Sequence, residues 1–169
     1  MNDAFVAVLM GSDSDLPTVQ GAIDVLDQFN IPCEVKITSA HRTPASTVHY
    51  VQDAEARGCA LFICAAGLAA HLAGSVAAHT IRPVIGIPME SGPLNGMDAL
   101  LSTVQMPGGV PVACMAIGRA GARNAGYFAA EILALSSHEL AARLRADREN
   151  SQASVLAKDN DLRRRRGQG

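Results

Sequence analysis

Five short apolar runs, separated by segments with helical spacing, place the strongest limit on how this chain can fold. The first run is apolar throughout, which is typical of a strand covered on both faces. The strand-like runs are residues 5–10, 33–39, 60–66, 83–89 and 110–117. The helix-like segments between and after them are about 16–29, 44–57, 68–80, 97–104 and 122–135. Strands that alternate with helices in this way predict an α/β fold with a parallel sheet.

The connections between these elements are short, and crossovers between parallel strands are right-handed. The leading topology is therefore a flavodoxin-like three-layer sandwich with about five parallel strands, plus a C-terminal helix and tail. One catalytic α/β domain is predicted over residues 1–148, including that helix. Residues 149–169 are polar and contain four consecutive arginines, so a disordered basic tail is expected. Alternatively, the arginine run could bind nucleic acid.

Charge and composition exclude several classes of partner. The net charge is -2, and the acidic body of the chain lacks the basic footprint of a nucleic-acid-binding protein. No apolar run is long enough to span a membrane and no signal peptide is visible, so the reducing cytoplasm is the expected location. The four cysteines form no CxxC pair, which favours burial as small apolar side chains. The five histidines include no close ligand pair, and no metal site is predicted.

The turn after the second strand, residues 39–44, has the sequence Ser-Ala-His-Arg-Thr-Pro. His41 can move protons near neutral pH, and the Arg42 guanidinium can bind a phosphate or a carboxylate. A strand-to-helix turn in an α/β protein lies at the carboxyl edge of the sheet, where ligands bind. Thr43 can cap the next helix, and Pro44 suits its first turn. Taken alone, a His-Arg pair is more often two solvated loop residues than part of a site. The two motifs described next favour a functional role for this pair.

The turn after the first strand, residues 11–15, has the sequence Gly-Ser-Asp-Ser-Asp. The hydroxyls of Ser12 and Ser14, with the first N–H groups of the following helix, suit a phosphate monoester. The turn lacks the Gly-Lys-Ser/Thr of a P-loop and the glycine spacing of a dinucleotide site. Asp15 could accept hydrogen bonds from ribose hydroxyls, or it could simply be a helix cap.

A third segment, residues 67–74, is rich in small residues and follows the third strand. Gly67 and its neighbours allow a close approach to the backbone by a ligand or by another helix. His71 is expected at the same sheet edge as His41, either as part of the site or as a hydrogen-bonded core histidine. No Gly-x-Ser-x-Gly nucleophile elbow is present, and the third strand lacks the aspartate of a receiver domain. The residues alone therefore predict a small phosphorylated ligand and proton-transfer chemistry.

The order and spacing of four motifs resemble the 5-(carboxyamino)imidazole ribonucleotide mutase family of purine biosynthesis. The motifs are residues 11–15, 39–44, 66–74 and 102–107, and the resemblance covers about residues 5–135. It implies a cytoplasmic, flavodoxin-like enzyme that is usually octameric and uses no metal or organic cofactor. Its partners would be a small-molecule ribonucleotide substrate and further copies of the chain, with neither nucleic acid nor membrane involved.

The resemblance also implies a reaction, in which a carboxylate moves from the exocyclic nitrogen to carbon 4 of an aminoimidazole ribonucleotide. In the implied route, carbon dioxide is released, held in the site and added to the ring carbon. His41 matches the general acid/base of the family, a role that imidazole suits. The implied substrate-binding positions are Ser12, Ser14, Asp15, Ser39, Arg42, Gly67, Leu68 and His71.

Two other functions compete with this one. The Arg-Thr-Pro after His41 resembles the mutase branch, whereas a sister branch carboxylates aminoimidazole ribonucleotide directly with carbon dioxide. A ribonucleotide-binding module without turnover is the non-enzymatic alternative. The chain also departs from the family wording, with Leu68 in place of a glycine and Ala73 in place of a proline. If position 68 requires positive φ, a leucine there is strained and changes the shape of the pocket.

Overall fold

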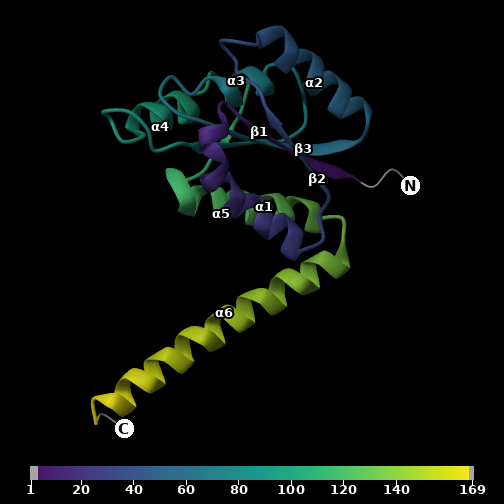
Figure 1. The fold of residues 1–169 in the computed structure, drawn as a ribbon. Helices are drawn as coiled ribbons and strands as arrows, with labels where there is room; N and C mark the ends of the chain where they lie inside the picture. The colour runs from purple at the N-terminus through teal and green to yellow at the C-terminus, as the bar shows by residue number, and fades with distance from the viewer. Residues whose placement is uncertain (1–3, 168–169) are drawn as a thin grey trace. The chain divides into compact units, whose positions relative to one another are not determined.

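The computed structural model describes residues 4–167, which form two compact units divided between Ala130 and Glu131. The first unit is a five-stranded, fully parallel sheet between two layers of helices (Figure 1). Its strands are β1 (Phe5–Met10), β2 (Cys33–Ile37), β3 (Cys59–Ala66), β4 (Val84–Pro88) and β5 (Ala113–Cys114). Their order is β2-β1-β3-β4-β5. This order confirms the predicted flavodoxin-like α/β fold.

The helices of this unit cover both faces of the sheet. They are η1 (Asp13–Asp15), α1 (Leu16–Gln28), α2 (Pro44–Ala56), α3 (Leu72–Ala77), α4 (Met97–Val104) and α5 (Gly118–Ala134), of which the last four residues belong to the second unit. Figure 1 shows α1 and α5 on one side of the sheet and α2, α3 and α4 on the other. The alternation of side chains along β1 explains the arrangement, because Phe5, Ala7 and Leu9 pack in one cluster with α2 and α3. No side chain of β1 is more than 7% exposed.

Two elements are shorter than the sequence analysis predicts. The helix expected over residues 68–80 is reduced to α3, because residues 67–71 form a turn in which Leu68 has a φ of 54°. The strand expected over residues 110–117 pairs with β4 at Ala113 and Cys114 alone. Pro111 lacks an N–H group and cannot donate to the ladder, which agrees with a strand that begins only at Ala113.

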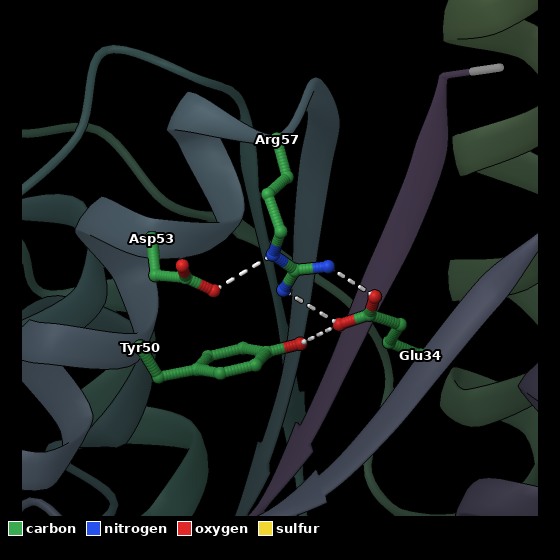
Figure 2. Close-up of polar contacts among 4 residues, drawn as sticks. All are labelled: Glu34, Tyr50, Asp53 and Arg57. Atoms are coloured by element: carbon green, nitrogen blue, oxygen red, sulfur yellow. Dashed lines mark hydrogen bonds and ion pairs between the residues drawn. The ribbon is translucent and has the colours of Figure 1, made fainter. Parts of the chain in front are cut away.

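Four polar side chains tie the edge strand β2 to the end of α2 (Figure 2). The Arg57 guanidinium binds both oxygens of Glu34 and donates to Asp53 Oδ2 over 2.7 Å. The Tyr50 hydroxyl donates to Glu34 Oε2 over 3.0 Å. The hydrogen bonds from Arg57 lower the pKa of Glu34, so the cluster stabilises the fold above the ordinary pKa of 4.5 and loses that effect as the pH falls below it. The contribution is small because these side chains remain partly exposed to water.

The second unit is dominated by α6 (His138–Arg165), which differs from the predicted disorder of the C-terminal segment. Residues 149–165 continue this helix because they contain no glycine or proline and are rich in helix-favouring side chains. Ser137 caps the start by accepting from the N–H of Leu140, and three arginines in the last turn complement the helix dipole. The domain boundary at residue 148 stays a prediction, and residues 1–3 and 168–169 lie outside the described part of the chain.

Within residues 4–167, we find no helix with both the length and the apolarity needed to cross a bilayer. The described cysteines are free thiols. Cys59 and Cys64 are buried, and burial raises the pKa of the Cys59 thiol to about 11. These two side chains therefore pack as small apolar groups, as predicted. Cys33 and Cys114 are partly buried.

A chain with few aromatic residues builds its core from small side chains, and α1 and α5 approach closely as a result. A Cβ atom at Gly126 of α5 would lie 2.8 Å from the carbonyl oxygen of Ala22 and 2.8 Å from Val25 Cβ on α1. Gly21 on α1 faces α5 with more room, because a Cβ there would lie 3.7 Å from the nearest atom, the backbone nitrogen of Arg123. The two glycines therefore differ in what an added methyl group would meet.

We expect Gly126→Ala to lower the free energy of unfolding by about 1–3 kcal/mol, since the added methyl group overpacks the contact between the helices. The matched control, Gly21→Ala, meets ordinary contacts and gains helix propensity, so it should leave stability unchanged or raise it by up to about 1 kcal/mol. Denaturant unfolding measures both variants. Equal stability of the two would contradict the close packing of α1 on α5.

Candidate functional site

A pocket of about 520 Å³ lies at the carboxyl edge of the sheet, above the ends of β1, β2 and β3. This is the side on which the connections from β1 and β3 diverge, the usual ligand position in a doubly wound fold. Its volume falls within the range of small-molecule sites. The lining residues are Gly11, Ser12, Ser14, Asp15, Ser39, Ala40, His41, Arg42, Ala66, Gly67, Leu68, Ala69, His71, Leu72 and Ser91. All nine residues that the sequence analysis selects are among them, drawn from three separate turns.

The turn after β2 is held by hydroxyl groups rather than by apolar packing. Thr38 is buried, and its hydroxyl lies 2.7 Å from that of Thr47 on α2. The Thr43 hydroxyl accepts from the Ser39 N–H over 2.9 Å, and the Thr43 N–H donates to the Ser39 carbonyl oxygen, also over 2.9 Å. The predicted capping role of Thr43 is wrong in one respect. Thr43 occupies the N-cap position of α2, but its side chain closes the turn instead of capping the helix.

Arg42 connects the turn after β2 to the end of β1. Its Nη2 donates to the carbonyl oxygen of Gly11 over 2.9 Å, and its backbone N–H donates to the Ser39 hydroxyl over 3.2 Å. A guanidinium has five N–H donors, so this bond leaves others for a ligand. The contact positions a permanent positive charge beside the turn that carries Ser12 and Ser14.

Ser12 and Ser14 present two hydroxyls together at the start of η1. The Ser14 hydroxyl donates to Ser12 Oγ over 2.9 Å, and Ser12 Oγ also accepts from the Ser14 N–H over 3.3 Å. Asp13 Oδ1 accepts from the Ser12 hydroxyl and from the same Ser14 N–H, each over 3.1 Å. The turn is therefore ordered internally before any ligand binds.

Asp15 stands at the N-cap position of α1, but its side chain makes no capping hydrogen bond. Partial burial raises its pKa, which outweighs the opposing effect of a hydrogen bond from the Ser12 backbone. A partly desolvated carboxylate that lines a pocket is a good acceptor for hydroxyl groups of a ligand. The geometry is thus compatible with the ribose-binding alternative that the sequence left open for Asp15.

His41 and His71 contact each other across the pocket. Nε2 of His41 lies 2.7 Å from Nδ1 of His71, and the rings meet edge to face with centroids 4.8 Å apart. One nitrogen of this pair must donate and the other accept, so the contact holds a single proton between the rings. Both side chains are exposed to the pocket rather than buried in the core. The pair can therefore take up or release a proton at the surface that a ligand would occupy.

The motif at residues 102–107 contacts the segment that carries His71 but does not itself line the pocket. Ser102 Oγ accepts from the N–H of Ala70 over 3.0 Å and donates to the Asp98 carbonyl oxygen over 2.7 Å. A Cβ at Gly74 would lie 3.2 Å from the sulfur of Met106. These contacts hold the turn that carries His71, so the motif positions the site without lining it.

The sequence analysis missed Ser91, which follows β4 and also lines the pocket. Its Oγ is buried and has no hydrogen-bond partner in the described residues. The signal that could have identified it is its position, because the carboxyl ends of neighbouring parallel strands meet at one edge. Within residues 4–167, no group of three or more His, Cys, Asp or Glu side chains is arranged to hold a metal ion.

A family model described as AIR carboxylase matches residues 5–154. The chain belongs to the AIR carboxylase family. A relative from Bacillus subtilis named N5-carboxyaminoimidazole ribonucleotide mutase is 52% identical over 157 residues, covering 93% of this chain and 97% of the relative. A relative of the same name from Mycobacterium leprae is 51% identical over 162 residues, covering 96% and 94%.

A solved structure described as Treponema denticola PurE superposes on this member of the AIR carboxylase family with a TM-score of 0.86. The two chains are 29% identical, and the match covers 94% of this chain and 98% of the other. The fold seen here is therefore shared with a solved structure over nearly its whole length.

Comparing Asp13 with Asp15, both in the turn after β1, tests whether Asp15 has a structural role in this AIR carboxylase site. A raised pKa in the folded chain means that ionised Asp15 costs stability, most at neutral pH and not at all below the ordinary pKa of 3.8. We expect Asp15→Ala to be at least as stable as the wild type at pH 7, with the difference disappearing as the pH falls toward 3.8.

The matched control is Asp13→Ala, which removes an acceptor of two hydrogen bonds and should cost about 0.5–1 kcal/mol. Thermal unfolding at pH 7 and pH 4 compares the two variants. A larger loss of stability in Asp15→Ala than in Asp13→Ala would show that Asp15 is structural.

Proposed function

We propose that this chain is an N5-carboxyaminoimidazole ribonucleotide mutase of purine biosynthesis, an isomerase that moves a carboxylate from the exocyclic nitrogen to carbon 4 of the imidazole. The observation that carries the proposal is the His41–His71 contact of 2.7 Å inside a pocket that also holds Ser12, Asp15 and Arg42. The roughly 50% identity to relatives of that name supports it.

The pocket offers a separate partner for each part of a ribonucleotide. The hydroxyls of Ser12 and Ser14 and the remaining N–H groups of Arg42 would bind the phosphate, because Arg42 already lies against the end of β1. The Asp15 carboxylate would accept hydrogen bonds from the ribose. The imidazole would then face His41 and the backbone at Gly67.

The reaction needs one group that acts first as an acid and then as a base, and we assign both roles to His41. The bond between the exocyclic nitrogen and the carboxylate carbon breaks, carbon dioxide leaves, and His41 delivers a proton to the nitrogen. Carbon 4 then attacks carbon dioxide with the electron pair of the ring, and His41 removes the proton from carbon 4. The proton count balances over the cycle, and His71 lies within hydrogen-bond distance of His41 in this structure.

Carbon dioxide must stay in the site between the two steps. The pocket wall near the histidines is made of small or apolar groups, Gly67, Leu68 and Ala69, which leave little to hold water there. This composition favours retention of an apolar intermediate beside the ring.

We further propose that the enzyme is a cytoplasmic homo-octamer, as the family resemblance implies. Four exposed apolar side chains on and before α4 fit a contact with another copy: Leu94, Met97, Leu101 and Val104. Light scattering should give a mass well above the 17.6 kDa of one chain, and Leu101→Glu should reduce it by placing a charge in the contact. A wild-type monomer at micromolar concentration would contradict this proposal.

The activity test supplies 5-(carboxyamino)imidazole ribonucleotide without ATP or metal and follows carboxylation of carbon 4. We expect conversion by the wild type and a loss of at least about 100-fold in His41→Asn, because general acid–base catalysis typically contributes this much. Binding of the ribonucleotide should change little. His49→Asn is the matched control, since His49 is exposed on α2 and does not line the pocket.

Each alternative function predicts a different result in the same assay. Product from aminoimidazole ribonucleotide and bicarbonate, with none from the carboxyamino compound, would assign the direct carboxylase reaction instead. Binding without either conversion would assign a ribonucleotide-binding module.

A further inference from the structure

Leu68 adopts a backbone conformation that a leucine rarely takes. Its φ of 54° lies in the left-handed region, where the Cβ crowds the backbone and glycine is favoured. Its side chain is 53% exposed, so burial alone does not explain why the conformation persists. Neighbouring structure must hold it, as is usual for strained residues at functional sites.

The neighbour that accommodates Leu68 is Gly92, in the turn after β4. A Cβ at position 92 would lie 2.6 Å from Leu68 Cδ2, closer than carbon atoms approach, so the leucine occupies the space that any side chain at 92 would need. Gly92 also has a positive φ of 66°. In the conformation seen here, Leu68 therefore leaves no room for a side chain at position 92, and a larger residue there would force the leucine side chain to move.

Gly67 and Ser91, the residues next to Leu68 and Gly92, also pack closely, but here the glycine is in the turn after β3 and the side chain comes from the turn after β4. A Cβ at Gly67 would collide with Ser91 Oγ and would lie 3.3 Å from Ser91 Cβ. The side chain at 68 thus fills the space beside 92, and the side chain at 91 fills the space beside 67. We call these four residues, Gly67, Leu68, Ser91 and Gly92, the interlock.

The interlock lies directly after the last paired residues of β3 and β4. β3 and β4 are paired up to Ala66 and Pro88, and the N–H of Met89 donates to the Ala66 carbonyl oxygen over 2.9 Å. Past that bond, the contacts of the interlock join the two turns. Gly67, Leu68 and Ser91 line the pocket, whereas Gly92 does not. A change at Gly92 would therefore act on the site only through the other three residues.

We propose that Leu68 and Gly92 are a matched pair of positioning residues, which hold Gly67 and Ser91 at the wall of the pocket for the carboxylate transfer. The catalytic part of this inference rests on the proposed function, whereas the packing part does not. The resemblance places a leucine where the family has glycine, and the lack of a side chain at Gly92 leaves room for that leucine.

The test is a double-mutant cycle with Gly92→Ala, Leu68→Gly and the double variant. Gly92→Ala should lower kcat/KM about 10-fold and lower the melting temperature by about 4 °C, since it displaces the Leu68 side chain from its place at the pocket wall. In the double variant, both values should return to within about 3-fold and 2 °C of those of Leu68→Gly alone, because the space beside 92 is open again.

Gly109→Ala controls for the strain of a Cβ at positive φ. Gly109 has a φ of 94°, and a Cβ there would meet no atom within 4 Å, so its kcat/KM should stay within 2-fold of the wild type. The double variant Leu68→Ala, Gly92→Ala provides a second test of rescue. It keeps a Cβ atom at positive φ at position 68 but removes the Cδ2 atom that lies near position 92. If Gly92→Ala alone does not fold, recovery of folding in either double variant is the supporting result.

Two outcomes would overturn the pairing: a Gly92→Ala variant that matches Gly109→Ala in stability and kcat/KM, or a loss in Gly92→Ala that neither substitution of Leu68 reverses. If Gly92→Ala lowers the melting temperature and the double variant restores it, while kcat and KM of Gly92→Ala equal those of the wild type, the positioning role would be overturned. If the wild type itself converts no substrate, the proposed function fails. The pairing is then decided by melting temperature, and the positioning role by the affinity for aminoimidazole ribonucleotide, measured by calorimetry on the same variants.

Discussion

Parallel pairing of β1 on both of its edges is the constraint on which the site depends. β1 hydrogen-bonds to β2 on one side and to β3 on the other, so the three carboxyl ends reach the same edge of the sheet. The chain leaves β1 toward α1 and β2 and later returns to β3 on the opposite side. The turns after these strands therefore diverge, and the pocket lies between them.

Polar contacts then convert this edge into a chemical site. The buried Thr38 hydroxyl holds the turn after β2, and Arg42 bonds across to Gly11 at the end of β1. The contact between His41 and His71 joins the turns after β2 and β3. Each of these bonds connects two different turns or elements, so the functional groups are placed by the sheet rather than by local sequence. Small residues contribute by letting backbone segments approach closely.

Much of the fold and site could be predicted because the signals were periodic or local. Continuous apolar runs mark buried strands, and polar turns directly after them lie at one edge, which predicts that His41, Asp15 and their neighbours lie together there. The errors have physical causes as well. Residues 149–165 are too polar to predict a packed element, yet they contain no glycine or proline and continue the helix that begins at the Ser137 cap. Ser91 carries only a positional signal, its place after β4, because nothing in its residue type distinguishes it from any other serine in a loop.

The sequence by itself determined the order of strands and helices along the chain, the parallel sheet and nine of the residues at its carboxyl edge, because these follow from hydrophobic periodicity and chain direction. The tertiary structure alone decided which side chains touch. Only the fold shows that Thr43 closes a turn instead of capping α2, and that the strained Leu68 fits beside Gly92. The physical reason is that such contacts join residues distant in the chain, and their distances depend on the packing of the whole sheet.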